Sequence, residues 1–156
     1  MVMKKNNINH KAKSKDTKLE FRVRKVLWKR GLRYRKNVSI LFGTPDIAFP
    51  NLKFVIFIDS CFWHGCPKHF KLPKKNSLFW EKKIERNIER DLEVTKHYTC
   101  NGWTILRIWE HDIKSSFEQI IEEVIITHNK LKYAEENKKF SFEASFENSL
   151  PFDEEC

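Results

Sequence analysis

The segment from Val55 to His69 constrains the fold more than any other part of the chain. It begins with Val-Ile-Phe-Ile-Asp, an apolar run that ends in Asp59, and strands of this composition lie in a protein core. Two cysteines, two histidines and an aromatic pair then follow within ten residues. A core strand that delivers an acid, thiols and imidazoles at its end is expected to build a site. A second acid, Asp46, precedes another short apolar strand.

The other apolar patterns predict further strands and three helices. Thr17-Lys-Leu-Glu20 has the spacing of a helix capping box, and a core stripe and then Gly31 follow it. A long helix begins near Ser77, and a last amphipathic helix begins near Ile113. Strands are expected over residues 33–38, 46–49, 53–59 and 103–109. This order predicts an α/β fold in which helices flank a mixed central sheet in three layers.

The charge of the chain is positive and unevenly spread. The net charge is +9, and because residues 133–156 carry −5, residues 1–132 carry +14. A basic region of this size attracts polyanions, usually nucleic acid; the alternative is a basic surface that only aids solubility. We predict a basic flexible arm over residues 1–15, one folded domain over 16–132 and an acidic, disordered tail over 133–156.

The sequence contains neither an apolar run of membrane-spanning length nor a signal peptide. We therefore expect a cytoplasmic protein. In a reducing compartment the four cysteines are more readily explained as metal ligands or core residues than as disulfides.

The two acids at the strand ends are candidates for metal binding. Adjacent strands bring Asp46 and Asp59 close, and paired carboxylates favour a hard cation such as Mg²⁺ between them. The alternative is that each acid caps a turn. His64 follows closely enough to share the same cleft and to move protons there, although a lone histidine is often structural. From its pattern alone, Glu20 is a structural capping-box residue.

The cysteines and histidines after the strand have spacing suited to zinc. Cys61, Cys66 and His69 supply three ligands within nine residues, and a tetrahedral site needs a fourth. His111 follows a strand that returns to the same region; the other candidates are His97, Cys100 and Cys156. The alternative is that Cys61 and Cys66 are small core residues.

Aromatic and basic residues near the same segment suggest contact with DNA. Aromatic rings can wedge between bases while lysines hold phosphates. The alternative for the aromatics is ordinary core packing. The candidates are Phe62, Trp63 and Trp80, with Lys71, Lys74 and Lys75 in the loop before the long helix.

Together these residues resemble the very short patch repair (Vsr) family of DNA mismatch endonucleases. The Cys61-Phe-Trp-His64 cluster is the most specific piece of the resemblance, and the pieces run in the family's order over about residues 14–115. They are Ser14–Glu20, Gly31–Arg35, Pro45-Asp46, Val55–Pro67, Phe79–Ile84, Arg86–Asp91 and Gly102–Glu110.

The resemblance implies a PD-(D/E)xK restriction-endonuclease-like fold and Mg²⁺-dependent nicking beside T:G mismatches that arise from 5-methylcytosine deamination. It implies Asp46 and the Ile58 carbonyl as Mg²⁺ ligands, His64 as a catalytic residue and Glu20 as an acid near the active site. It implies that Phe62, Trp63 and Trp80 intercalate, and it supports a structural zinc site of Cys61, Cys66, His69 and His111.

Two positions depart from the family pattern. Asp59 stands where some members place a second catalytic histidine, and Ser60 replaces a usual glycine. A carboxylate at position 59 brings the site closer to the two-acid pattern of the wider nuclease superfamily, so Asp59 joins the predicted catalytic residues.

The sequence leaves other functions open. One is a restriction-type nuclease that cuts matched duplex, and another is a zinc-stabilised DNA-binding protein without catalysis. We expect a monomer of bacterial type that acts at the nucleoid. The segment Asn148–Phe152 is a possible docking motif for a repair partner.

Overall fold

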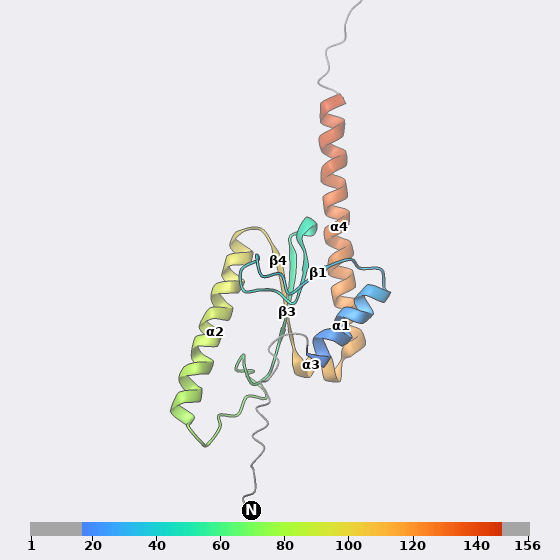
Figure 1. Cartoon of the computed structure of the whole chain (residues 1–156). Helices are drawn as coiled ribbons and strands as arrows, with labels where there is room; N and C mark the ends of the chain where they lie inside the picture. Colours follow the sequence, from blue (N-terminus) through green and yellow to red (C-terminus); the bar gives the residue numbers. More distant parts are fainter. Residues whose placement is uncertain (1–16, 148–156) are drawn as a thin grey trace, which may run out of the picture.

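Four strands form one mixed sheet at the centre of the protein (Figure 1). The computed structural model describes residues 17–147. In spatial order the strands are β1 (Arg35–Lys36), β2 (Ile47–Phe49), β3 (Phe54–Asp59) and β4 (Thr104–Trp109). The pairs β1–β2 and β2–β3 are antiparallel, whereas β3 and β4 run parallel. A short 3-10 turn, η1 (Pro50–Leu52), joins β2 to β3.

Helices cover both faces of this sheet, as the apolar strands require. The crossover helix α2 (Ser77–Cys100) joins the parallel strands β3 and β4 and packs on one face, where Val55 and Phe57 meet Val94 and Tyr98. On the other face, Phe54 and Ile56 pack against α1 (Lys18–Lys29), α3 (Glu110–Ser115) and α4 (Phe117–Glu147). The prediction of a mixed sheet flanked by helices is therefore confirmed.

The loop before β2 is held close to α2, and this fixes the position of Asp46. Gly43 has a positive φ of 74°, and a Cβ added there would lie 2.7 Å from a methyl group of Val94. The hydroxyl of Tyr98 donates to the Phe42 carbonyl at 2.8 Å. Because the loop is pinned at two points, β2 and the acid that precedes it have a defined register against β3.

The sequence prediction differs from the structure at the first strand and at the tail. The strand expected over residues 33–38 is only two residues long, Arg35–Lys36. The segment from Tyr133 to Glu147, which was expected to belong to the acidic tail, continues α4 in the structure (Figure 1). The arm over residues 1–15 and the docking segment over 148–152 lie outside the described residues.

Local helix chemistry accounts for the extension of α4. The segment after Leu131 contains neither glycine nor proline before Glu147 and is rich in Ala, Glu and Lys, which favour helices. Two ion pairs at helical spacing support it, Lys132–Glu136 at 3.7 Å and Glu135–Lys138 at 3.0 Å.

None of the helices within residues 17–147 is both long enough and apolar enough to cross a membrane.

Candidate active site

A cleft of about 640 Å³ opens beside the end of β3. It is bordered by the start of α1, the segment that follows β3, the middle of α2 and the start of α3. Among the residues proposed from sequence, Glu20, Ile58, Trp63 and His64 line it. The remaining lining residues are Thr17, Leu19, Ser60, Asn87, Arg90 and Glu110. Elements far apart in sequence thus converge on one cleft.

Asp46 is anchored to the strand that borders this cleft. Since β2 and β3 are antiparallel, the start of β2 lies beside the end of β3, and Asp46 Oδ2 accepts a hydrogen bond from the Ile58 amide at 2.7 Å. Burial raises the pKa of Asp46 to about 6, and the negative charges of Glu20 and Asp59 act in the same direction. The local field therefore opposes ionisation of Asp46.

This environment fits a hard cation. Asp46 Oδ1 has no hydrogen-bond partner within residues 17–147, and Ile58, whose backbone is bonded to Asp46, lines the cleft with Glu20. Carboxylate and carbonyl oxygens are the ligands that Mg²⁺ prefers. A cation among these oxygens would also relieve the repulsion that raises the Asp46 pKa.

Glu20 combines the capping role with a place in the cleft. Its amide donates to Thr17 Oγ1 at 3.2 Å, which is the N-cap bond that the predicted capping box requires, and the Thr17 hydroxyl donates to Glu20 Oε1 at 2.9 Å. Arg24 lies 3.4 Å from the other carboxylate oxygen. The Glu20 side chain is buried yet borders the cleft, so its structural role and its predicted place at the site are compatible.

Asp59 is held by an arginine. Only 3% of its surface is exposed, and the two carboxylate oxygens accept from Arg107 Nε at 2.6 Å and from a terminal Arg107 nitrogen at 2.8 Å. Arg107 also contacts a third residue, Asp91 of α2, at 3.0 Å. From its sequence position Asp59 is expected beside Mg²⁺, whereas in the structure its carboxylate oxygens accept hydrogen bonds from a guanidinium group.

His64 is oriented by Asp91. The two side chains meet at 2.5 Å between His64 Nδ1 and Asp91 Oδ2, and Asp59 Oδ1 lies farther from the same nitrogen, at 3.6 Å. Burial acts to raise the pKa of Asp91, but the hydrogen bond from His64 and the charges of His64 and Arg107 outweigh it and lower that pKa. Asp91 therefore stays ionised and can fix the imidazole ring.

Sequence reasoning missed Asp91 and Arg107, although each leaves a signal. Asp91 closes the segment Arg86–Asp91, which was recognised as part of the family resemblance but given no role. Arg107 is the only charged residue in β4, an otherwise apolar strand apart from its first residue, Thr104. A charge in the middle of such a strand needs a buried partner, and β3 supplies one in Asp59.

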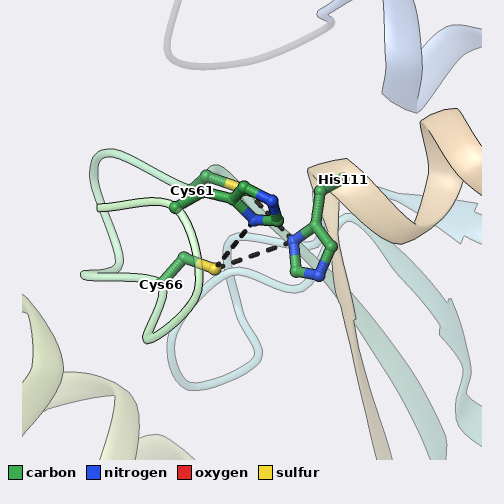
Figure 2. Close-up of side chains that lie close together, drawn as sticks. Cys61, Cys66 and His111 are labelled. Carbon is green, nitrogen blue, oxygen red and sulfur yellow. Dashed lines mark hydrogen bonds between the residues drawn. The ribbon is translucent and has the colours of Figure 1, made fainter. Parts of the chain in front are cut away.

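Four sulfur and nitrogen ligands gather beside the cleft. One ligand atom from each of Cys61, Cys66, His69 and His111 lies within 4.8 Å of all the others. Figure 2 shows that Cys61, Cys66 and His111 point toward one another, from the segment after β3 and from α3. His97 and Cys100, the other described candidates for the fourth ligand, are not in this group.

The spacing of these ligands suits a tetrahedral metal ion. The Cys61 Sγ–His111 Nδ1 distance is 3.3 Å, and Cys66 Sγ lies 3.7 Å from Nδ1 of both His69 and His111. Zinc bound to thiolates at about 2.3 Å and imidazoles at about 2.0 Å would separate sulfur from nitrogen by about 3.6 Å. The group is therefore a possible metal site whose donors and distances fit zinc.

The aromatic residues that are candidates for DNA contact form one cluster next to the Cys/His group. The ring of Phe62 lies 5.1 Å from Trp63 and 5.4 Å from Trp80, and the two tryptophans are 5.9 Å apart. Lys83, which sequence reasoning did not select, places its ammonium 5.3 Å from Trp63 and 5.7 Å from Trp80. The predicted lysines Lys71, Lys74 and Lys75 are exposed in the loop that leads to α2.

Comparisons with known proteins identify the family of this chain. Residues 2–70 match the family described as DNA mismatch endonuclease Vsr. The Type II nicking enzyme V.NmeDIP of Neisseria meningitidis serogroup C is 47% identical over 65% of this chain and 70% of its own length. V.HpaIIP of Haemophilus parainfluenzae, also a Type II nicking enzyme, is 44% identical over 72% of this chain and 82% of its own. DNA mismatch endonuclease Vsr of Escherichia coli (strain K12) is 33% identical over 72% of both chains.

The family match and these relatives define the class of the protein as DNA endonuclease. The chain belongs to the Vsr family of DNA mismatch endonucleases. The family resemblance and the DNA-endonuclease class expected from sequence are confirmed.

Proposed function

We propose that the protein is a strand-nicking endonuclease that cuts duplex DNA beside T:G mismatches, the product of 5-methylcytosine deamination. One observation carries this proposal: His64 and Trp63 line the same cleft, and Trp63 belongs to the cluster with Phe62 and Trp80. A proton-transferring group thus lies beside aromatic rings suited to entering a base stack. The Vsr family membership and the Type II nicking enzymes among the relatives support the same reading.

Asp46 and the Ile58 carbonyl would hold the catalytic Mg²⁺. When bound, Mg²⁺ would neutralise charge on the scissile phosphate and make a water molecule more acidic. Asp46 must be ionised to bind Mg²⁺, and the negative charge of Glu20 is one of the factors that raise the Asp46 pKa. Asp46 directly precedes β2 and Ile58 lies in the neighbouring strand β3, and the hydrogen bond from the Ile58 amide holds the Asp46 carboxylate beside β3. The two proposed ligands would therefore be in place before DNA binds.

His64 would manage the proton in phosphodiester hydrolysis. Its Nδ1 is engaged by Asp91, which leaves Nε2 as the ring nitrogen for proton exchange. In the reaction a water oxygen bonds to phosphorus as a phosphorus–oxygen bond of the backbone breaks. Nε2 would take the proton of the attacking water or, when protonated, give one to the leaving oxygen.

The Cys/His group would hold structural zinc and so stabilise the segment that carries Phe62, Trp63 and His64. Cys61 and Cys66 flank those three residues in sequence, and His111 ties them to the start of α3. The segment lacks helix or strand structure, so a closed metal site would replace the missing backbone pairing. The lysines near the cluster would contact phosphates.

A nicking assay on matched oligonucleotide duplexes tests this function. The duplexes are identical except for a T:G mismatch or a C:G pair, the latter with and without 5-methylcytosine, in several sequence contexts, with Mg²⁺ or EDTA. The proposal predicts a Mg²⁺-dependent nick on the T strand of the mismatched duplex. Cleavage of the matched duplex would indicate a restriction-type nuclease, and binding without cleavage in every context would indicate a non-catalytic DNA-binding protein.

A further inference from the structure

Arg107 occupies a position that the proposed mechanism does not use. It lies in the middle of β4, paired with Phe57 of the parallel strand β3, so its side chain shares the α2-facing side of the sheet with Phe57 and Asp59. Its guanidinium carbon lies 5.2 Å from the centre of the Phe57 ring. The side chain is largely buried, with 20% of its surface exposed. A cation buried at this place needs compensating charges.

Two carboxylates supply that compensation, one from each neighbouring element. Asp59 of β3 takes the bidentate hydrogen bonds of Arg107. The same terminal nitrogen, Nη2, that donates to Asp59 also lies 3.0 Å from Asp91 Oδ1 of α2, and the other terminal nitrogen, Nη1, donates to the Asp91 backbone carbonyl at 3.3 Å. The planar guanidinium can hold both acids at once because its five donors have fixed directions.

Both acids also face the same nitrogen of His64. Asp91 Oδ2 lies at hydrogen-bond distance from Nδ1, whereas Asp59 Oδ1 is 3.6 Å away. If Arg107 were absent, Asp59 would be a buried carboxylate without its two donors, and His64 Nδ1–H would be the nearest replacement. The two acids would then compete for one imidazole, and the ring would lose its single orientation.

We propose that Arg107 is a positioning residue for His64, and that Asp59 is the anchor of Arg107 rather than a ligand of the catalytic metal. Arg107 keeps Asp59 occupied so that Asp91 alone orients the imidazole. This inference rests on the proposed nicking function. It explains why a carboxylate stands at position 59 and why a charged residue interrupts the apolar strand β4.

The proposal separates three variants by their rates. Arg107→Met should lower the single-turnover rate by roughly 10–100-fold, the size typical of residues that orient a functional ligand, with DNA affinity in EDTA little changed. The single-turnover rate of Asp59→Asn should stay within about threefold of the wild-type rate, because a neutral amide does not compete for the imidazole N–H as a carboxylate does. The double variant Asp59→Asn/Arg107→Met should recover most of the rate lost by Arg107→Met.

The test measures these rates on a T:G duplex, together with thermal melting and long-range ¹H–¹⁵N spectra of the histidines at one pH. His64 should show a single Nδ1–H tautomer in the wild type and the double variant, and a mixture of ring states in Arg107→Met. The double variant matching Arg107→Met in rate would overturn the proposal, as would Asp59→Asn losing as much activity as Asp46→Ala. The second result would indicate that Asp59 is a ligand of the catalytic metal.

Two further arms keep the test decisive. If Arg107→Met does not fold, Arg107→Lys replaces it; a single ammonium cannot bond both acids, so a reduced rate that Asp59→Asn restores is expected, and no restoration would contradict the proposal. If the wild type nicks no duplex, the nicking function fails by itself. The His64 spectra then still decide whether Arg107 and Asp59 control the imidazole.

Discussion

His64 Nδ1 and Asp91 Oδ2 meet at 2.5 Å although the two residues are 27 positions apart in the chain. The contact joins the irregular segment after β3 to the middle of α2, so the crossover helix both covers the sheet and contributes to the site. An acid on one ring nitrogen fixes the tautomer and leaves the other nitrogen for chemistry. The orientation of His64 in the cleft thus depends on Asp91, a residue of α2.

Replacing Asp91 tests this relationship. Asp91→Asn keeps the size of the side chain but removes the charge that orients His64 and pairs with Arg107. We expect the single-turnover nicking rate to fall by roughly 10–100-fold, with DNA binding in EDTA retained. Glu93→Gln, an exposed position on the same helix, is the matched control and should leave the rate unchanged. Equal rates for Asp91→Asn and the control would show that Asp91 does not orient His64.

Asp46 makes the stability of the metal-free protein depend on pH. Its pKa in the folded protein is raised from 3.8 to about 6, so the folded state binds a proton more tightly than the unfolded chain. The stability from this proton is fully present below pH 3.8 and is lost as pH rises through about 6. Asp46→Asn keeps an acceptor for the Ile58 amide and carries no such loss.

We therefore expect Asp46→Asn to be more stable than the wild type at pH 8 in EDTA, by up to about 3 kcal/mol, and similar to it near pH 4. Denaturant unfolding at the two pH values measures the difference. A variant that is equally or less stable at pH 8 would show that burial and Glu20 do not oppose ionisation of Asp46.

The Cys/His group predicts one bound zinc ion per chain. Cys66→Ser should remove the zinc and lower the melting temperature, because the segment from Cys61 to His69 loses its metal crosslink. Cys100→Ser, at an exposed position at the end of α2, is the control and should keep both zinc and stability. Metal analysis and thermal melting check this. Zinc bound in stoichiometric amount by Cys66→Ser would rule out the assigned ligand set.

The aromatic cluster predicts a loss of DNA affinity when a ring is removed. Trp63→Ala or Trp80→Ala should weaken binding to the mismatched duplex by roughly 1–3 kcal/mol, the range for stacking of a base on an aromatic side chain. Trp28→Ala, at an exposed tryptophan of α1 that does not line the cleft, is the control. Equilibrium binding in EDTA separates affinity from cleavage. Equal affinities for all three variants would mean that the cluster packs without contacting DNA.

Much of the fold could be predicted from the sequence because it follows from local patterns. The apolar runs of β3 and β4, the capping box of α1 and the four-residue repeat of α2 each fix an element with few neighbours involved. The extent of α4 beyond Tyr133 was not predicted, because the acidic net charge of the tail drew attention away from a segment of strong helix formers. The length of β1 depends on pairing with β2, which no single-strand pattern reveals.

The candidate site was predicted where its residues are close in sequence and missed where packing creates it. The short segment from Cys61 to His69 shows three candidate ligands directly, whereas spacing left the fourth open among His111, His97, Cys100 and Cys156, and the structure places His111 with the other three. The partners of Asp59 and His64 come from β4 and α2, so only the three-dimensional structure shows that Arg107 and Asp91 meet them. Pairwise spacing cannot distinguish an acid that binds metal from one that binds arginine.

The most direct test of the account compares the wild type with Asp46→Ala on a labelled T:G duplex, measuring Mg²⁺-dependent nicking and DNA binding on the same preparations. Asp46 is the predicted metal ligand and accepts a hydrogen bond from the Ile58 amide, whereas the rings predicted to contact DNA are those of Phe62, Trp63 and Trp80. The account predicts a nick on the T strand by the wild type, no nick by Asp46→Ala, and similar DNA affinity for both. Strong Mg²⁺-dependent nicking by Asp46→Ala would contradict the assignment of the catalytic centre.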